Sequence, residues 1–165
     1  MLRRMDDLDR EIARIEAAER RNERAWRRVD AEIAGGPLSR TFAGSWLRGD
    51  QESLVVAFTT EVEAAAAQLR AAVPDAPLEV VQRPRTLRAL EELEAEVVEA
   101  ASRLAQEISY TGIDLDDSVV EAMLEDLENA ATQSLQRQFD GRPVRWSEGI
   151  VVAAVGEAVP SSRDR

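Results

Sequence analysis

The same order of segments, strand, strand, helix and strand, occurs twice in this sequence, and no other feature constrains the fold as strongly. Ser53-Leu54-Val55-Val56 in the first half corresponds to Ser118-Val119-Val120-Glu121 in the second, at an offset of about 65 residues. A proline-bearing segment follows the helix in each half. Repetition at a fixed offset is typical of a chain built from two related units. We therefore expect an α+β fold with two ββαβ modules joined by a long helix.

Local signals place the elements of the first module. A Gly-Asp turn separates two β-prone runs, which predicts a hairpin. Thr60 followed by Glu63 matches a capping box, so a helix is expected to begin there. Prolines after this helix and after the next apolar run end both segments. The sequence thus predicts strands over 45–48, 53–58 and 78–83 and a helix over 61–73.

The second module repeats this pattern after a connecting helix. That helix is expected from Thr86 to about Glu107, with apolar residues along one side. An Asp116-Asp117 turn separates the two strands of the next hairpin. Asp140-Gly141-Arg142-Pro143 ends the following helix. The predicted elements are strands over 109–115 and 118–123, a helix over about 125–139, and a strand from Val144.

A long amphipathic helix is predicted over residues 2–33, ahead of both modules. Its narrow apolar seam is interrupted by polar Glu19 and Asn22, and Gly35-Gly36-Pro37 ends it. Such a seam forms a coiled coil or packs on the protein's own core, and the sequence leaves intramolecular packing and a homodimer equally open. The seam residues are Leu8, Ile12, Ile15, Trp26 and Val29.

These segments divide the chain into five parts. The last stretch, from Gly149, is expected to extend a strand, and the Pro-Ser-rich end to be flexible. The predicted parts are the N-terminal helix (1–36), the first ββαβ module (42–84), the connecting helix (85–108), the second ββαβ module (109–155) and a flexible tail (156–165).

The residue types that are missing exclude most catalytic chemistry. All 21 basic residues are arginine, and the chain has no lysine, histidine or cysteine. Without histidine and cysteine there is no zinc finger, disulfide, Ser-His-Asp triad or thiol nucleophile. Without lysine there is no P-loop or Schiff base. We expect the protein not to be an enzyme and to need no cofactor.

The charge distribution argues against nucleic acid and membrane as partners. Residues 1–33 carry nine Arg and nine Asp or Glu, whereas the rest of the chain carries the whole net charge of −11. Nucleic acid binding needs a basic surface. No apolar run approaches the ~20 residues of a membrane span. The sequence starts without an apolar signal region, which predicts a cytoplasmic protein.

The order of segments resembles the prodomains of alpha-lytic-protease and streptogrisin-type secreted serine proteases. Phe42-Ala43-Gly44-Ser45-Trp46 followed by Leu54-Val55-Val56-Ala57-Phe58-Thr59 is similar to the first hairpin of that family, and Gly112-Ile113-Asp114-Leu115 turning into Val119-Val120 is similar to its second. Thr86-Leu87-Arg88-Ala89-Leu90 matches the helix between the modules, with Ala89 in place of the family's acidic residue. The resemblance covers roughly residues 1–150.

The resemblance implies a non-catalytic role as folding chaperone and inhibitor of a serine protease. In that family the C-terminal sheet docks on the protease, and the tail leads into its active site. Carried over by position, the partner-binding residues would be Tyr110, Ile113, Leu115, Val120, Val144 and Trp146, with the tail after Gly149. The family is exported and joined to its protease, so this chain is expected to be a free-standing relative or a fragment of a precursor.

Several other interpretations remain beside this one. A scaffold protein would self-associate through the N-terminal helix, and a small-ligand sensor would have an apolar pocket between the modules. Asp114, Asp116 and Asp117 suggest calcium ligands, but their spacing lacks the glycine and distal glutamate of an EF-hand, and a solvated turn is favoured. The acidic run from Glu107 to Glu128 would face an Arg-rich partner or simply favour solubility.

Overall fold

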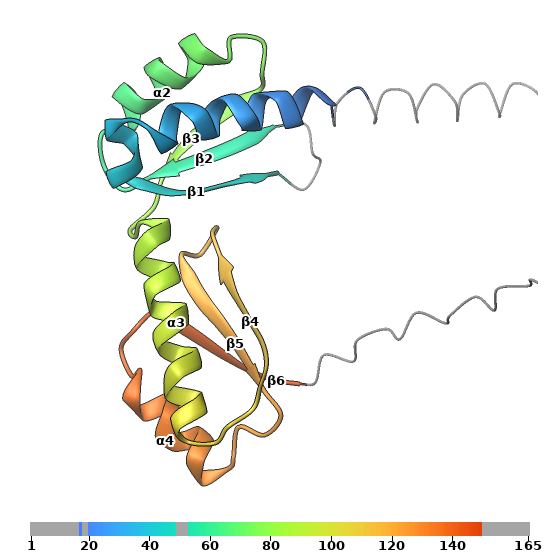
Figure 1. Ribbon diagram of the computed structural model, residues 1–165, viewed down its shortest axis with the longest axis vertical. Coiled ribbons are helices and arrows are strands. Elements are labelled where there is room, and N and C mark those ends of the chain that lie inside the picture. The colour runs from blue at the N-terminus through green and yellow to red at the C-terminus, as the bar shows by residue number, and fades with distance from the viewer. Residues whose placement is uncertain (1–16, 18–19, 49–52, 150–165) are drawn as a thin grey trace, which may run out of the picture.

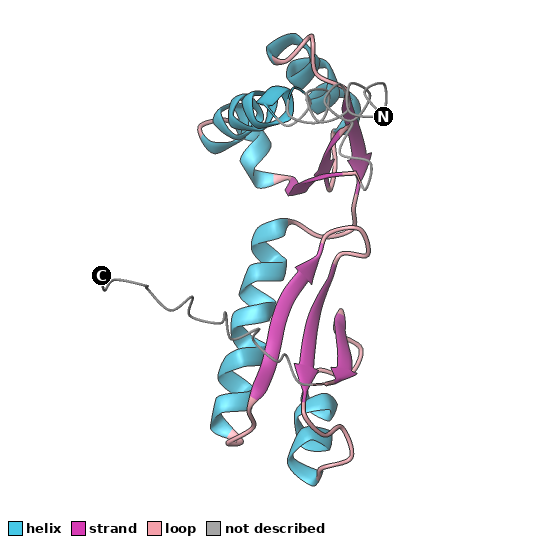
Figure 2. Ribbon diagram, turned by 90° about the vertical axis from the view of Figure 1, so that its right-hand side faces the viewer, coloured by secondary structure: helices cyan, strands magenta, loops and turns pink. Residues whose placement is uncertain are grey.

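The computed structural model describes residues 17, 20–48 and 53–149, and within them it has the α+β architecture expected from the repeat (Figures 1 and 2). An N-terminal helix that includes residues 20–34 precedes two three-stranded sheets, which lie one after the other along the long axis of the molecule. The first sheet contains β1 (Phe42–Leu47), β2 (Leu54–Phe58) and β3 (Leu78–Gln82), preceded by the short 3-10 helix η1 (Pro37–Arg40) and with α2 (Val62–Ala72) before β3. After α3 (Leu87–Arg103), the second contains β4 (Ile108–Asp114), β5 (Val119–Leu124) and β6 (Val144–Glu148), with α4 (Ala130–Gln138) before β6.

The two modules share one topology and one register. In each, the first two strands are antiparallel and the third strand is parallel to the second, which lies in the centre. Leu54 pairs with Leu78 and Val120 pairs with Val144, so counterparts are 66 residues apart. An irregularity near the start of the first strand also recurs at this spacing, after Phe42 and after Ile108. The repeat seen in the sequence is therefore a structural repeat.

The prolines that separate helix from strand have the same function in both modules. The Leu54 N–H donates to the Pro77 carbonyl at 2.9 Å, and the Val120 N–H donates to the Pro143 carbonyl at the same distance. Proline ends the preceding segment because it has no N–H, yet its carbonyl still accepts a hydrogen bond. Each proline thus aligns the third strand with the start of the central strand, at Leu54 in β2 and at Val120 in β5.

Each long helix packs on the sheet that follows it. Ala25, Val29 and Ile33 of the N-terminal helix belong to the core of the first module, which we call the first core. Leu93 and Val97 of α3 likewise belong to the core of the second module, which we call the second core. In the described part of the N-terminal helix, the apolar seam is therefore used within the chain, with Trp26 half-buried beside it. The seam residues Leu8, Ile12 and Ile15 lie outside the described residues.

The central strands differ in a way that matters for function. All five residues of β2 are buried, so both faces of the first sheet are covered. In β5 burial alternates: Val120, Ala122 and Leu124 are buried against the helices, whereas Val119, Glu121 and Met123 are only partly covered. Continuous and alternating burial indicate a sheet covered on two faces and a sheet covered on one. Within the described part of the chain, one face of the second sheet is thus open.

The second module covers the additional face of the first sheet. Gly44 has φ +130°, and a Cβ atom there would lie 2.6 Å from a methyl group of Leu115, so the Leu115 side chain lies directly against the Gly44 backbone. The Arg83 guanidinium lies 5.4 Å from the ring centroid of Trp46 and bonds Asp116 at 3.1 Å. These contacts join the β4–β5 turn to β1 and to the segment after β3. The side chains of Leu115, Arg83 and Asp116 therefore fill the space between the modules near β1.

One predicted helix cap and two predicted helix boundaries were wrong, while α2 matches the predicted helix over 61–73 to within one residue at each end. The Thr60–Glu63 capping box does not form, because Glu61, with φ 56°, precedes α2 and no side chain caps it. The second long helix ends at Arg103 because Ala105 has φ 52° and the Gln106 N–H bonds the Ala101 carbonyl. The last helix begins at Ala130 because the Asn129 side chain accepts the Ala131 N–H. The predicted strand extension beyond Gly149 and the tail over 156–165 lie outside the described residues.

Replacing Gly44 with alanine tests the contact between the modules. The new Cβ would overlap Leu115 and would also impose a strained backbone at positive φ. We expect the free energy of unfolding to fall by about 2 kcal/mol, the usual scale for strain and overpacking together. Urea unfolding measures this loss, and small-angle scattering reports any change in the arrangement of the modules.

The matched control is Gly35→Ala. A Cβ at Gly35 would meet no atom within 4 Å, so this variant is expected to change stability by less than about 0.5 kcal/mol. Equal stability of the two variants would contradict the packing of Leu115 on Gly44.

Candidate docking surface on the second module

Of the six residues predicted to bind a partner, Tyr110 is the one that is exposed. It has 46% of its surface exposed and lies on β4, an edge strand of the second sheet. A Cβ at Gly112 would lie 2.2 Å from the Tyr110 hydroxyl, so the tyrosine side chain extends along β4 and across Gly112. Large exposed aromatic side chains are common at the centre of protein interfaces. Tyr110 is therefore the best-supported residue of the predicted set.

The remaining five residues are part of the core or of the contact between modules. Val120 is fully buried in the second core, so its side chain is inaccessible to a partner, and its place in the predicted surface is corrected. Ile113, Val144 and Trp146 are half-buried against the same core, and the Trp146 ring makes an edge contact with Phe139 at 6.2 Å. Leu115 lies against Gly44 of the first module. These side chains stabilise the fold.

The open face of the second sheet contains residues that the sequence-based prediction missed. Tyr110 pairs with Met123 and Gly112 pairs with Glu121, so these side chains share one face. In the first module the corresponding positions, 66 residues earlier, include Val55 and Ala57, which are 1% and 0% exposed. The same face is thus covered in the first module and open in the second. The alternation of polar Glu121 with apolar neighbours is the sequence signal of this difference.

Arg145 organises the charges at the end of this face. It forms ion pairs with Asp114 at 2.9 Å, with Glu121 at 2.8 Å and with Asp117. The hydrogen bonds that Arg145 donates to Asp117, then to Asp114 and Glu121, raise the pKa of Arg145 further above its usual range. One arginine therefore fixes three acidic residues around the β4–β5 hairpin, and these acids are not free to face a partner independently.

Asp114 also shapes the turn. Its carboxylate accepts the backbone N–H groups of Asp116 at 3.0 Å and Asp117 at 3.1 Å. The N–H of Asp117, and secondarily the side chain of Arg145, hold the pKa of Asp114 below its ordinary value. The acids suggested as calcium ligands, Asp114, Asp116 and Asp117, thus form hydrogen bonds and ion pairs within the fold. In the described part of the chain no group of three acidic side chains is placed to hold a metal ion.

A shallow groove lies on the helix side of the same edge strand. It is lined by Thr111 of β4 and by α3 residues that include Ala95 and Val98, and Val98 is 46% exposed. Val98 follows the buried Val97 and therefore falls outside the apolar stripe of α3. Its exposure adds apolar surface next to the edge of the sheet.

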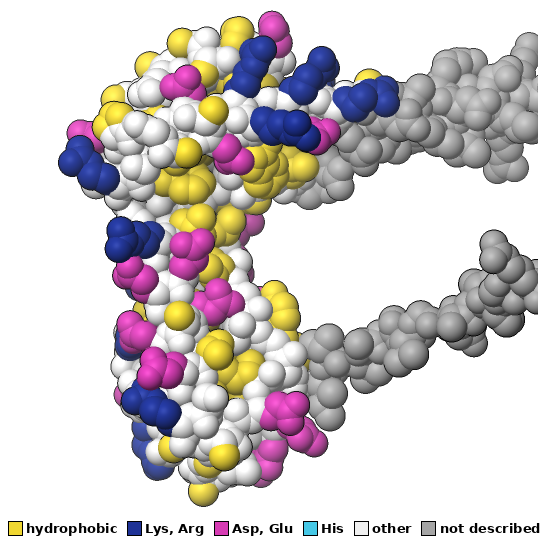
Figure 3. Space-filling model, in the orientation of Figure 1, with side chains coloured by type: hydrophobic (Ala, Val, Ile, Leu, Met, Phe, Trp, Pro, Cys, Tyr) yellow, Lys and Arg dark blue, Asp and Glu magenta, His cyan; other side chains and the backbone are white. Residues whose placement is uncertain are grey.

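The two modules also differ in charge. Figure 3 shows arginine side chains along the N-terminal helix and a mixture of acidic and arginine side chains on the second module. Residues 83–149 carry seven Arg and 15 Asp or Glu, a net charge of −8 out of the −11 of the whole chain. A cationic partner would be attracted to the second module before contact.

The lowered pKa of Asp114 predicts a defined pH dependence. A carboxylate whose folded pKa is below its unfolded value, about 3.9, contributes stability above pH 4 that is lost as the pH falls through the folded pKa. Asp114→Asn keeps the acceptor oxygen of the turn but not the charge. We expect the free energy of unfolding to fall less between pH 5 and pH 2 in this variant than in the unmodified chain.

Urea unfolding at each pH measures the effect, and Arg145→Gln is the companion variant. Because both changes remove one interaction, the double variant should lose less stability at pH 7 than the sum of the two single variants. Identical pH profiles for Asp114→Asn and the unmodified chain would contradict the assignment.

Comparison with known proteins does not indicate a function, so the function is inferred from the geometry described above. The sequence matches no protein-family model and no curated protein closely enough to carry a function over to it. None of the helices in the described part of the chain has the length and apolar content that a membrane span requires. The structure itself offers an open sheet face, a free edge strand and an exposed tyrosine.

Proposed function

We propose that this chain is a non-catalytic binding module, similar to the prodomains of alpha-lytic-protease and streptogrisin-type proteases, that docks its second sheet on a serine protease. Docking would make it a folding chaperone of that protease, an inhibitor, or both. The observation that carries the proposal is the unequal burial of the two sheets. A face that the first module buries is left open in the second, next to the free edge of β4.

The edge strand provides the means of attachment. An edge strand has main-chain N–H and C=O groups that no neighbouring strand uses, and an extended segment of a partner can add to them as a further strand. Main-chain hydrogen bonds of this kind give affinity, while neighbouring side chains give specificity. The exposed Tyr110 on β4 is suited to the second task, because it presents an apolar ring and a hydroxyl group to the partner.

The fixed arrangement of the two modules also supports a chaperone role. Leu115, Arg83 and Asp116 hold the β4–β5 turn against the first module, so the open face has a defined orientation before any partner binds. A surface that is already ordered loses little conformational entropy on binding. It can therefore act as a template on which a folding partner completes its own packing.

The charge of the second module indicates the electrostatic character of the partner. With a net charge of −8 over residues 83–149, the docking side favours a protease with a basic surface opposite β4 and β5. Association should then be faster at low ionic strength, and the dependence on salt should be a property of the association rate. The tail after Gly149, which the family resemblance also implicates, lies outside the described residues.

The proposal is tested with an alpha-lytic or streptogrisin-type protease. The purified chain is expected to inhibit peptide hydrolysis by the native enzyme and to accelerate recovery of activity from the denatured enzyme. Tyr110→Ser should weaken inhibition by about tenfold to a hundredfold, the cost of removing a central aromatic side chain from an interface. Inhibition constants and refolding rates are the two measurements.

Leu104→Ser is the control, because Leu104 is 36% exposed at the C-terminal cap of α3, outside the open face and outside the groove lined by Val98. It should leave inhibition within twofold if the open face is the docking surface. Full inhibition by Tyr110→Ser, or no effect of the unmodified chain on any protease of this class, would contradict the proposal.

A further inference from the structure

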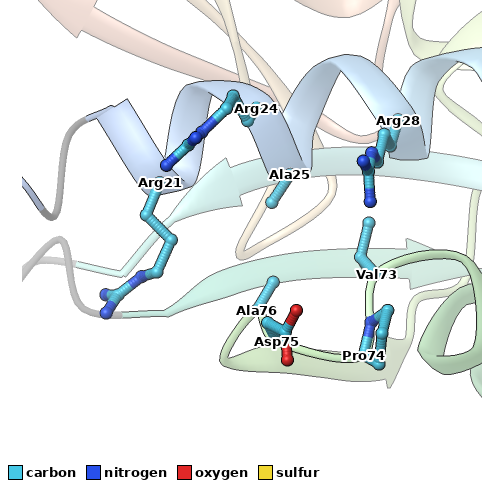
Figure 4. Close-up of a pocket in the computed structure, with 8 residues that line it drawn as sticks. All are labelled: Arg21, Arg24, Ala25, Arg28, Val73, Pro74, Asp75 and Ala76. Carbon is cyan, nitrogen blue, oxygen red and sulfur yellow. The ribbon is translucent and has the colours of Figure 1, made fainter.

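The first module contains a second feature that the proposed function does not use, a cavity surrounded by arginine. The N-terminal helix presents Arg21, Arg24 and Arg28 on one side, at spacings of three and four residues. Figure 4 shows Arg24 and Arg28 on the helix above the turn that follows α2, where Asp75 lies, and Arg21 extending downward to one side of that turn. The cavity between helix and turn has a volume of about 230 Å³. Three guanidinium groups and one carboxylate give it a net charge of +2.

The charges around this cavity are not neutralised by one another. In the described part of the chain, Arg21, Arg28 and Asp75 form no ion pair, and Arg24 donates through Nε to the Arg20 carbonyl at 3.2 Å. By contrast Arg27, on another side of the same helix, bonds Glu23 at 2.6 Å. Like charges three and four residues apart on a helix repel each other. The chain has 32 acidic residues, yet three arginines line this one cavity.

In the second module, an ion pair joins the long helix to the turn that precedes the third strand. Val29 and Val97 each belong to the core of their own module, and the residue before each is charged, Arg28 in the N-terminal helix and Glu96 in α3. The turn after α2 corresponds to the turn after α4, where Arg142 bonds Glu96 at 2.5 Å. Helix and turn are thus joined by an internal ion pair in the second module. In the first module the helix side is cationic and the ion pair is absent among the described residues.

We infer that the cavity binds a small organic dianion, either a phosphate monoester or a dicarboxylate. The net charge of +2 matches such a ligand, and arginine binds phosphate and carboxylate oxygens with paired N–H groups. Buried Ala25 and Val73 give the cavity an apolar wall, which suits a ligand with a small carbon body. The volume accommodates a molecule of a few carbon atoms and excludes a folded partner.

Titration with glycerol phosphate, succinate and inorganic phosphate tests the inference. Binding to the full chain is followed by calorimetry and by the ¹⁵N resonances of the arginine side chains, with sodium chloride at matched ionic strength as the reference. We expect a 1:1 complex with glycerol phosphate or succinate that is tighter than the complex with inorganic phosphate. Arg24→Gln and Arg28→Gln should each weaken it about tenfold, the loss of one charge-assisted hydrogen bond pair.

Two further variants separate a site from a solvated basic surface. Arg27→Gln removes the same charge from the same helix outside the cavity and should change affinity less than twofold. Asp75→Asn removes the one acid among the described residues that line the cavity and should strengthen binding severalfold. Equal weakening by Arg27→Gln and Arg28→Gln, or equal resonance shifts with sodium chloride, would overturn the inference. Circular dichroism checks that each variant retains the fold. The readout is ligand binding and does not involve protease inhibition, so this test is independent of the proposed docking function.

Discussion

The contact of Leu115 with Gly44 is the constraint on which the arrangement of this molecule depends. Gly44 has a backbone conformation that other residues rarely adopt, and its missing side chain leaves room for a leucine from the second module. Arg83 strengthens the contact by lying over Trp46 and bonding Asp116. Because of this contact, the two similar modules lie in series instead of facing each other.

A serial arrangement of two copies leaves one surface without a counterpart. The second module packs on the extra face of the first sheet at Gly44, whereas among the described residues no third module covers the corresponding face of the second sheet. The consequence is visible in the residues themselves: Val55 and Ala57 are buried, whereas Glu121 and Met123, at the same places of the repeat, are partly exposed. The proposed docking surface thus follows from the serial stacking of two modules with one topology. It needs no reactive side chain, in agreement with a chain that has no lysine, histidine or cysteine.

The two copies have also diverged in the charges that join their elements. Arg48 of the first module bonds Glu79 at 2.7 Å, and at the corresponding positions Asp114 bonds Arg145, with acid and base exchanged. On the helix side, Glu96 bonds Arg142 in the second module, whereas Arg28 in the first module forms no ion pair with any described residue. The first exchange preserves a structural ion pair. The second leaves positive charge at a cavity, which is why we interpret the two differences differently.

The sequence alone was sufficient for the fold, because the elements are marked by local features. The prolines at 77 and 143, the repeated apolar runs and Thr86, whose hydroxyl accepts the Ala89 N–H, are all local in the chain. Surfaces depend on contacts between distant residues, and for this reason their prediction was less accurate. Val120 belongs to the core, and Leu115 belongs to the contact with Gly44, 71 positions away in the sequence. Neither the cluster around Arg145 nor the cavity at Arg28 has a short-range pattern that would reveal it.

Amide hydrogen exchange of the complex with a catalytically inactivated alpha-lytic or streptogrisin-type protease tests the central claim most directly. If the second sheet docks on the partner through its open face and free edge, the amides of β4 should become protected on binding, while those of β1, the corresponding strand of the first module, should be unchanged. Protection of β1 or of the N-terminal helix, with β4 exchanging as in the free chain, would contradict the account.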